Sequence, residues 1–368
     1  MADVVVVDDS QFMRVQIREI LEDGKHTVVA EAENGKQGIA AVREHRPDVV
    51  TMDVKMPGMD GIETVSELMA TDPTPVLMLS RYTEEGAETT LDALDAGAVD
   101  FMMKPDGEVT ASLVEYADDL IELVSVVAQA DVDSTESAPS TASVPESTDP
   151  PSTPTVPDQL SAPDLATTDW ETPPTLFVAA STGGPSEIHT VLGALPATAG
   201  IRVVVVQHMP EQFTDRFANR LDDISAFDVR EAADGDRVGP NEAVVARGDH
   251  HLEIDRDFGT ELAVSLTDEP PVHSVRPAAD VTLESGAQTV SGPLVGVVLS
   301  GMGKDGAAGT EWIADAGGTV LVQDPETASI GSMPEHAIET GIVDEIHPTE
   351  DLPEAILDVL KSARDELS

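Results

Sequence analysis

The sequence contains no cysteine and few basic residues. Without cysteine, disulfides, thiol nucleophiles and thiolate metal sites are excluded. Only 20 lysines and arginines stand against 70 aspartates and glutamates, so the formal net charge is -50. Because such a chain is repelled by phosphate backbones and anionic lipids, we expect no nucleic-acid partner and no binding to an anionic membrane surface.

The acidic residues are spread through both halves of the chain, whereas acidic tails are usually confined to one segment. We interpret them as an adaptation to a salt-rich cytoplasm, where dense counterions screen the repulsion. No uncharged apolar run approaches membrane-spanning length, and residues 3–8 form a strand-like start without a basic leader. We therefore expect a soluble, halophilic, cytoplasmic protein that is not inserted in a membrane.

Residues 1–125 alternate apolar, strand-like runs with segments of helical periodicity. The runs are residues 4–7, 28–30, 48–53, 76–80 and 101–103. Five such repeats predict a doubly wound parallel sheet with helices on both faces.

Polar residues follow these runs where the strands should end, namely Asp8, Asp9, Asp53, Ser80 and Lys104. Because the carboxyl ends of parallel strands share one edge of the sheet, we expect these side chains to converge. Three carboxylates repel one another unless a divalent cation joins them, and hard oxygen ligands favour Mg²⁺. Any one of these residues could simply cap a helix, but the five together favour a phosphoryl site.

This pattern resembles the response-regulator receiver domain, which is flavodoxin-like. The resemblance rests on Asp8-Asp9, residues 52–61 (MDVKMPGMDG), Ser80 and residues 100–105 (DFMMKP). It implies that Asp53 accepts a phosphoryl group from a histidine kinase. It also implies an Mg²⁺ site, with the ligands Asp8, Asp9 and Asp53. The implied switch residues are Ser80, Phe101 and Lys104.

Residues 126–173 are rich in proline, serine, threonine and acidic residues, and no lysine or arginine occurs between Lys104 and Arg202. Such a stretch cannot bury enough apolar surface to fold. We expect a disordered tether that proline stiffens locally. Trp170 is expected to dock where the second domain begins.

Residues 174–368 again alternate strands and helices, and they predict a second, Rossmann-like parallel-sheet domain. The run 175–180 ends in Ser181-Thr182-Gly183-Gly184, so a serine stands at the end of a strand and beside a helix N-terminus. Alone, this pattern also fits a helix cap or a turn that cradles phosphate.

Two further strand ends change that balance. His208 follows the run 203–207, and Asp305 follows the run 294–300 after a short glycine-rich segment. Serine needs a base to act as a nucleophile near neutral pH, imidazole can supply it, and a carboxylate fixes the tautomer of the imidazole. A core histidine and a helix-capping aspartate remain the alternatives, but three such residues on one edge favour a Ser-His-Asp triad.

The second domain is similar to the catalytic domain of the CheB family, the chemotaxis receptor methylesterases and glutamine deamidases. The similarity rests on residues 180–184, 207–210, 213–214, 217–218, 248–249, 251, 270–272, 276–277 and 301–306. It implies that Ser181 is the nucleophile, His208 the general base and Asp305 its orienting partner. The implied oxyanion and substrate residues are Thr182, Gly183 and Met302. Val275 stands where relatives often have histidine, and Ser332 replaces a glycine.

The sequence thus predicts a phosphorylation-activated serine hydrolase. Its expected substrates are glutamyl γ-methyl esters on the cytoplasmic helices of chemoreceptors, with methanol released, and receptor glutamines, which would be deamidated. No cofactor is expected for the ester reaction. One alternative is a phosphorylation-gated binding module with an inert hydrolase domain. A DNA-binding response regulator is disfavoured because the chain has no basic patch.

Overall fold

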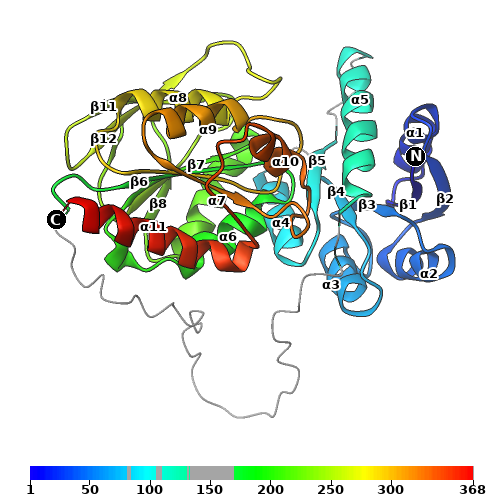
Figure 1. Ribbon diagram of the computed structural model, residues 1–368. Coiled ribbons are helices and arrows are strands. Elements are labelled where there is room, and N and C mark those ends of the chain that lie inside the picture. The colour runs from blue at the N-terminus through cyan, green and yellow to red at the C-terminus, as the bar shows by residue number, and fades with distance from the viewer. Residues whose placement is uncertain (81–83, 105–109, 131, 133–169, 368) are drawn as a thin grey trace, which may run out of the picture.

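The computed structural model describes residues 1–80, 84–104, 110–130, 132 and 170–367 of the 368-residue chain. Within these residues the chain forms two α/β domains, coloured blue to cyan and green to red in Figure 1. The predicted fold class, two domains built on parallel sheets, is confirmed.

The first domain is a five-stranded parallel sheet of order β2-β1-β3-β4-β5. Its elements are β1 (Asp3–Val7), α1 (Gln11–Asp23), β2 (Thr27–Ala32), α2 (Gly35–His45), β3 (Val49–Asp53), α3 (Gly61–Thr71), β4 (Val76–Ser80), α4 (Glu84–Asp95), β5 (Asp100–Met103) and α5 (Thr110–Val127). Helices α1 and α5 pack together on one face, and α2, α3 and α4 on the other. Local signals set the helix starts: the Asp60 carboxylate and Glu63, for example, form a reciprocal capping box at α3.

The second domain is built on a seven-stranded parallel sheet of order β15-β14-β13-β6-β7-β10-β8. Its strands are β6 (Thr175–Ala180), β7 (Arg202–Gln207), β8 (Asp228–Glu231), β10 (Glu242–Val245), β13 (Leu294–Val298), β14 (Thr319–Gln323) and β15 (Glu345–His347). Its α-helices are α6 (Gly184–Ala194), α7 (Glu211–Ile224), α8 (Ala279–Thr289), α9 (Ala307–Asp315), α10 (Ser332–Glu339) and α11 (Leu352–Leu367). From β6 the chain runs first toward β7 and later returns to β13 on the other side, so the strand order reverses at β6. A crevice at the carboxyl ends of the strands is expected at such a reversal.

Sequence reasoning missed a second, antiparallel sheet in this domain. It has the order β11-β12-β9, formed by β11 (His251–Asp257), β12 (Leu262–Thr267) and β9 (Arg237–Val238). The sequence indicates a short strand around residues 252–254, but not the pairing of β11 with β12 or of β12 with β9. These strands are short and partly polar, so no local sequence pattern predicts which strands pair with one another.

Most of the segment expected to be a linker lies outside the described residues. Helix α5 ends at Val127 and β6 begins at Thr175. Between them, Trp170 is half-buried, and its indole N–H donates to the carbonyl of Ala199 at 3.2 Å. Trp170 therefore docks at the start of the second domain, as expected.

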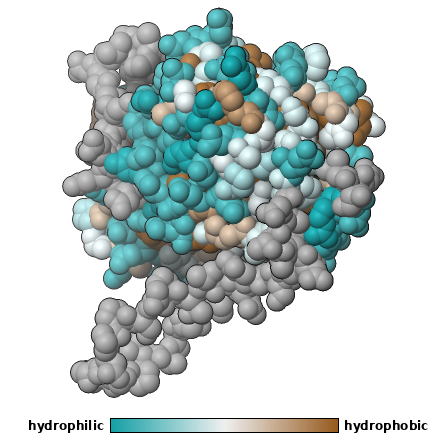
Figure 2. Space-filling model, turned by 90° about the vertical axis from the view of Figure 1, so that its left-hand side faces the viewer, coloured by the Kyte–Doolittle hydropathy of each residue, from teal (hydrophilic) through white to brown (hydrophobic). Residues whose placement is uncertain are grey.

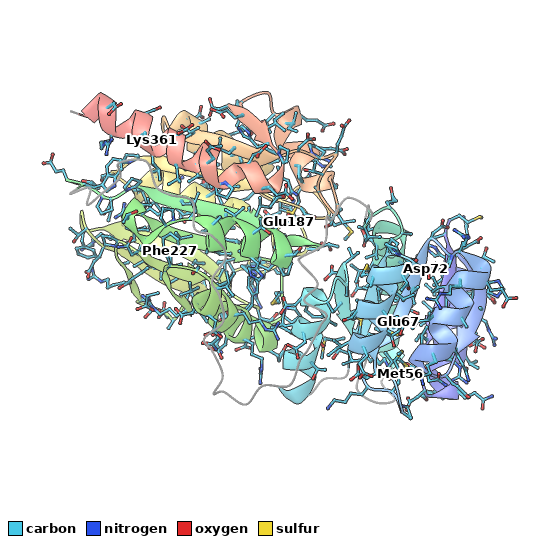
Figure 3. The ribbon with its side chains drawn as sticks, turned by 90° about the horizontal axis from the view of Figure 1, so that it is seen from below. Met56, Glu67, Asp72, Glu187, Phe227 and Lys361 are labelled. Carbon is cyan, nitrogen blue, oxygen red and sulfur yellow. The ribbon has the colours of Figure 1, made fainter. Side chains whose placement is uncertain are left out.

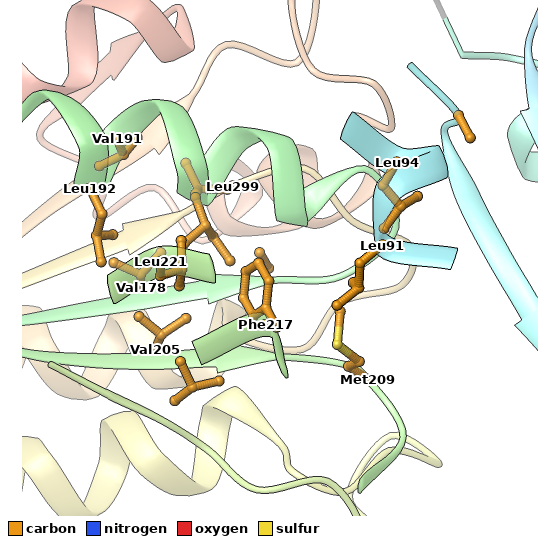
Figure 4. Close-up of a cluster of buried hydrophobic side chains, with 14 of the residues drawn as sticks. Leu91, Leu94, Val178, Val191, Leu192, Val205, Met209, Phe217, Leu221 and Leu299 are labelled. Carbon is orange, nitrogen blue, oxygen red and sulfur yellow. The ribbon is translucent and has the colours of Figure 1, made fainter. Parts of the chain in front are cut away.

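The two domains share one apolar cluster. Leu91 and Leu94 of α4 lie beside Met209 and Phe217 of the second domain (Figure 4), and all four are buried. Helix α4 packs against α7 and α6. The first domain is thus held against the carboxyl edge of the second domain's sheet by ordinary core packing.

The exposed face in Figure 2 is mostly hydrophilic, with small scattered apolar spots, as the acidic composition predicts. Among the described residues, no helix is both long enough and apolar enough to cross a membrane.

Candidate functional site

The sheet of the second domain brings Ser181 and His208 to neighbouring strand ends. Ala180 pairs with Gln207 in register, and the N–H of His208 donates to the carbonyl of Ala180 at 3.1 Å. Ser181 and His208 therefore leave β6 and β7 side by side. On the other side of β6, the N–H of Ser181 donates to the carbonyl of Ser300 at 3.0 Å.

His208 and Asp305 are in direct contact. The distance from His208 Nε2 to Asp305 Oδ2 is 2.7 Å, and the two side chains are 10% and 2% exposed. Burial alone would raise the pKa of the Asp305 carboxyl, but the His208 contact and the N–H groups of Asp280 and Ala279 outweigh it and lower that pKa. Asp305 is thus held ionised, as a group that orients an imidazole must be.

Ser181 lies beside this pair in a tightly packed turn. A Cβ added at Gly301 would lie 2.8 Å from Ser181 Cβ and 2.2 Å from Met333 Sδ, so only glycine allows this approach. Among the described residues, no hydrogen bond joins Ser181 Oγ to His208. Since Asp305 engages Nε2, the ring nitrogen left for a proton from Ser181 is Nδ1.

The other predicted site residues lie in or beside the turn that begins at Ser181. Thr182 is buried, and Gly183 has a φ of +77° and precedes α6 as its N-cap. A Cβ at Gly183 would meet Ser329 Cβ at 2.6 Å and Ser300 Oγ at 2.8 Å. Met302 is partly exposed and belongs to no helix or strand. Among the described residues, no backbone carbonyl accepts its N–H. Its N–H and the start of α6 are suited to an oxyanion.

Ser300 supports this turn, and sequence reasoning did not find it. Its hydroxyl donates to the carbonyl of Thr182 at 2.8 Å and accepts the N–H of Ile330 at 2.9 Å. Its own N–H donates to Gln323 Oε1 at 2.7 Å. Because Ser300 is fully buried, these contacts fix the backbone next to Ser181.

The same network continues to the first turn of α6. Gln323 Nε2 donates to Thr349 Oγ1 at 2.6 Å, and that hydroxyl donates to Glu187 Oε2 at 2.5 Å. Burial raises the pKa of Glu187, although the contacts with Thr349 and Gln323 oppose the shift. Figure 3 shows Glu187 at the end of the second domain that faces the first.

In the first domain, the predicted acidic site is assembled. The ligand oxygens of Asp8, Asp9 and Asp53 all lie within 4.8 Å of one another. Lys104 Nζ lies 2.7 Å from Asp8 Oδ2 and 2.5 Å from Asp53 Oδ1, and its side chain is 6% exposed. Burial raises the pKa of Asp53, Lys104 opposes the shift, and Asp8 and Asp9 add to it. A concentration of hard oxygens and like charge of this kind fits Mg²⁺.

Two of the three predicted switch residues lie toward the second domain. Thr90 of α4 donates its hydroxyl to Ser80 Oγ at 2.8 Å. The ring of Phe101 packs on the ring of Phe213 in α7, with centroids 4.3 Å apart. The predicted phosphoryl site is thereby connected to the domain interface through α4 and β5.

Comparison with known proteins assigns both domains. The family described as CheB methylesterase matches residues 176–356, and the response regulator receiver domain matches residues 4–115. A Natronomonas pharaonis protein called protein-glutamate methylesterase/protein-glutamine glutaminase is 50% identical over 356 residues, which cover 97% of each chain. The chain belongs to the CheB methylesterase family. The predicted family and hydrolase class are confirmed: it is a CheB methylesterase/glutaminase with a receiver domain, an enzyme of chemotaxis adaptation.

One further relative and one solved structure are similar to this chain. A Haloarcula marismortui protein-glutamate methylesterase/protein-glutamine glutaminase is 46% identical over 357 residues and covers 97% of both chains. The crystal structure of the Thermotoga maritima CheB methylesterase catalytic domain is 36% identical, covers 51% of this chain and 99% of that one, and has a TM-score of 0.49.

In this CheB-family chain the receiver lies directly against the turn that holds Ser181 and Thr182. The carboxylate of Asp100, the first residue of β5, faces the hydroxyl of Thr182. Burial raises the pKa of Asp100 to about 6, and the contacts with Thr182 and the N–H of Phe101 oppose the shift. A receiver carboxyl therefore borders the residue next to Ser181.

An ion-pair cluster closes the same interface farther out. Arg220 of α7 pairs with both Asp92 and Asp95 of α4. The three side chains line a cavity of about 340 Å³ between α4, α6 and α7, together with His189. They are partly exposed, so salt screens their attraction.

Proposed function

We propose that Ser181, His208 and Asp305 form the catalytic triad of this CheB-family enzyme and hydrolyse glutamyl γ-methyl esters on chemoreceptor helices. The observation that carries this proposal is the 2.7 Å contact from His208 Nε2 to Asp305 Oδ2, next to the strand-end serine. A carboxylate on Nε2 keeps the proton there and leaves the Nδ1 lone pair for the nucleophile.

The reaction then proceeds in two halves. His208 Nδ1 takes the proton from Ser181 Oγ as that oxygen attacks the ester carbonyl. The imidazolium returns the proton to the leaving methoxide, and methanol departs from an acyl-serine. Water, activated by the same nitrogen, releases the glutamate. A glutamine side chain follows the same path with ammonia as the leaving group.

The oxyanion of the tetrahedral intermediate is assigned to the turn around the nucleophile. We assign one hydrogen-bond donor for the oxyanion to the N–H of Met302, and we place Thr182 and Gly183 on the opposite side of the oxyanion. The positive end of α6 adds a favourable field. These donors are supported before the substrate arrives, because Ser300 fixes the carbonyl of Thr182.

In the receiver, Asp53 is proposed to accept a phosphoryl group from a chemotaxis histidine kinase. Asp8, Asp9 and Asp53 would hold Mg²⁺, which offsets charge on the phosphoryl oxygens. Lys104 supplies a fixed cation at Asp53 Oδ1. No metal is assigned to the ester reaction.

Regulation is proposed to run through the interface. In the packed arrangement, Asp100 faces Thr182 and Phe101 packs on Phe213. A new dianion at Asp53 attracts the Ser80 hydroxyl, which gives up its contact with Thr90. Since Thr90 belongs to α4, the face against α7 repacks, and the open state of the enzyme gains population.

The proposed partners follow from this reaction. The substrate is a methylated receptor helix on the cytoplasmic side of the membrane, and the phosphodonor is a kinase, so we place the enzyme in the cytoplasm. The charge of -50 makes molar salt the appropriate assay medium.

The decisive experiment is methanol release from methylated receptor membranes in molar KCl. Wild type, Ser181→Ala and Asp53→Ala are compared with and without a small phosphodonor, in Mg²⁺ and in excess EDTA. The proposal requires release that depends on Ser181. It also requires stimulation that depends on Asp53 and is lost in EDTA while the basal rate stays. Release that persists in Ser181→Ala contradicts the triad.

The same samples test the alternative of an inert binding module. A serine-directed phosphonate labels Ser181 only where the triad activates it. Labelling of wild type supports the enzyme, whereas a wild type that is phosphorylated but neither labelled nor active supports the binding module.

A further inference from the structure

A second carboxylate lies directly behind the Asp305 carboxylate. Asp280, in the first turn of α8, is 9% exposed. Its Oδ1 accepts the N–H groups of Gly306 at 2.9 Å and Gly309 at 2.6 Å. The N–H of Gly306 also reaches Asp305 Oδ1 at 3.1 Å. Asp280 therefore fastens the backbone segment that carries Asp305.

The other oxygen of Asp280 faces His273. The distance from His273 Nε2 to Asp280 Oδ2 is 2.7 Å. The contact between His208 and Asp305 has the same atoms and the same length, so a second histidine–aspartate pair lies behind the first. The two carboxylates and the His273 ring present ligand atoms within 4.8 Å of one another.

His273 is held in an unfavourable backbone conformation. Val272 and Val275 exchange two backbone hydrogen bonds of 3.2 and 3.0 Å, so His273 and Ser274 form a two-residue turn. Their φ angles are +53° and +66°. Such turns favour asparagine and glycine, and other residues are strained there unless contacts hold them. The contact with Asp280 is such a contact.

A metal ion does not account for this cluster. Each oxygen of Asp280 and Asp305 already accepts at least one hydrogen bond from nitrogen. The ionisable groups here are two histidines and two aspartates, supplied by the end of β7, the turn at residues 272–275, α8 and the segment before α9. The arrangement is two histidine–aspartate pairs back to back.

We propose that Asp280 and His273 are positioning residues for the triad. Asp280 fixes the segment of Asp305 through its two N–H contacts, and His273 fixes Asp280. The negative charge of Asp280 also stabilises the imidazolium that forms on His208 during the reaction, because the carboxylate of Asp280 lies next to that of Asp305, which contacts His208. This inference rests on the proposed triad.

The test uses the full chain and four variants in the methanol assay. Asp280→Asn removes the charge and keeps the shape. His273→Asn suits the left-handed turn but is too short to reach Asp280, so it removes the contact without straining the backbone. His273→Gln keeps a donor at the correct reach. The matched control is His250→Gln, because His250 also pairs with an aspartate, at 2.8 Å, and its side chain is 28% exposed, as is that of His273.

We expect Asp280→Asn to lower kcat about tenfold with little change in KM. The acid side of its rate–pH profile should move to lower pH by about half a unit, which a purely structural residue would not cause. His273→Asn should lower kcat about threefold, and His273→Gln and His250→Gln should match wild type within about twofold.

The outcomes distinguish a failure of the positioning role from a failure of the proposed triad. If Asp280→Asn is folded and keeps the wild-type kcat and profile, the positioning role is wrong while the triad stands. If Asp280→Asn does not fold, His273→Asn decides, and a wild-type kcat there overturns the inference. Release that does not need Ser181 in the parent enzyme contradicts the proposed function instead.

Discussion

The ring of Phe101 in the receiver packs against the ring of Phe213 in the catalytic domain, with centroids 4.3 Å apart and planes tilted by 34°. Phe101 is one of the predicted switch residues of the receiver. Phe213 lies in the first turn of α7, two turns before Arg220. The two rings therefore form an apolar contact between a predicted switch residue of the receiver and the catalytic domain.

Replacing Phe101 by leucine should loosen the closed state. The substitution keeps apolar bulk but removes the ring pair, which is worth about 1 kcal/mol beyond its burial. We expect the basal rate of methanol release to rise roughly fivefold, with the phosphodonor-stimulated rate unchanged. An equal loss or gain in both rates would place the effect in the catalytic domain. Phe258→Leu, at an exposed ring between β11 and β12 of the catalytic domain, is the control.

Asp100 should make the closed state sensitive to acid. Its pKa is raised from 3.8 to about 6 in the docked arrangement. A carboxyl with a raised pKa favours the docked state when protonated, so docking weakens as pH rises from about 4 to about 6 and changes little above. The ratio of stimulated to basal rate should therefore be larger at pH 5 than at pH 7.5.

Asp100→Asn provides the matching variant. It should have the large ratio at both pH values, because its side chain is neutral throughout. Taking the ratio cancels the pH dependence of the triad itself. A wild-type ratio that does not vary with pH would show that Asp100 does not control docking.

The pairs of Arg220 with Asp92 and Asp95 should matter most in dilute salt. Exposed pairs each contribute about 0.3–1 kcal/mol, and salt screens them. Arg220→Ala should raise the basal rate about threefold at the lowest salt that keeps the protein folded. In molar KCl the difference should shrink. Arg43→Ala, which breaks an exposed pair with Asp72 inside the receiver, should leave the basal rate unchanged.

Ser300→Ala should damage the nucleophile turn. The variant leaves the N–H of Ile330 without its hydroxyl acceptor and frees the carbonyl of Thr182. Losing such a buried contact lowers the free energy of unfolding by about 1–3 kcal/mol. We expect kcat and the rate of phosphonate labelling to fall together about tenfold. Ser285→Ala is the control, because that hydroxyl also accepts one N–H and donates to one carbonyl, away from Ser181.

The features of the fold that the sequence predicts are those that local pattern determines. Valine-rich runs specify buried parallel strands, and the residue after each run must lie at the carboxyl edge. For that reason the amino-acid sequence alone places Asp53, Lys104, Ser181 and His208 at strand ends. The receiver resemblance supplies the roles of Asp53 and Lys104, and the CheB resemblance those of Ser181 and His208; these roles remain predictions.

The features that the sequence does not predict depend on contacts between distant segments. Ser300 bonds the carbonyl of Thr182 across 118 residues of chain, and nothing near Ser300 announces that partner. The sequence around Asp280 and His273 does not predict their contact, because only the folded position of α8 brings Asp280 next to Asp305 and His273. The sheet of β9, β11 and β12 is likewise fixed by pairing rather than by local periodicity.

The apolar cluster that spans both domains has a consequence for anyone who removes the receiver to obtain a permanently active enzyme. Without α4, the side chains of Met209 and Phe217 lose their covering leucines, and Phe213 loses its ring partner. The truncated enzyme would then expose an apolar patch beside Ser181, and we expect this patch to cause self-association in molar salt, where the repulsion between the acidic copies is screened. Its copies would block one another's nucleophiles, so a truncated protein can be less active than the whole one at high concentration and more active on dilution.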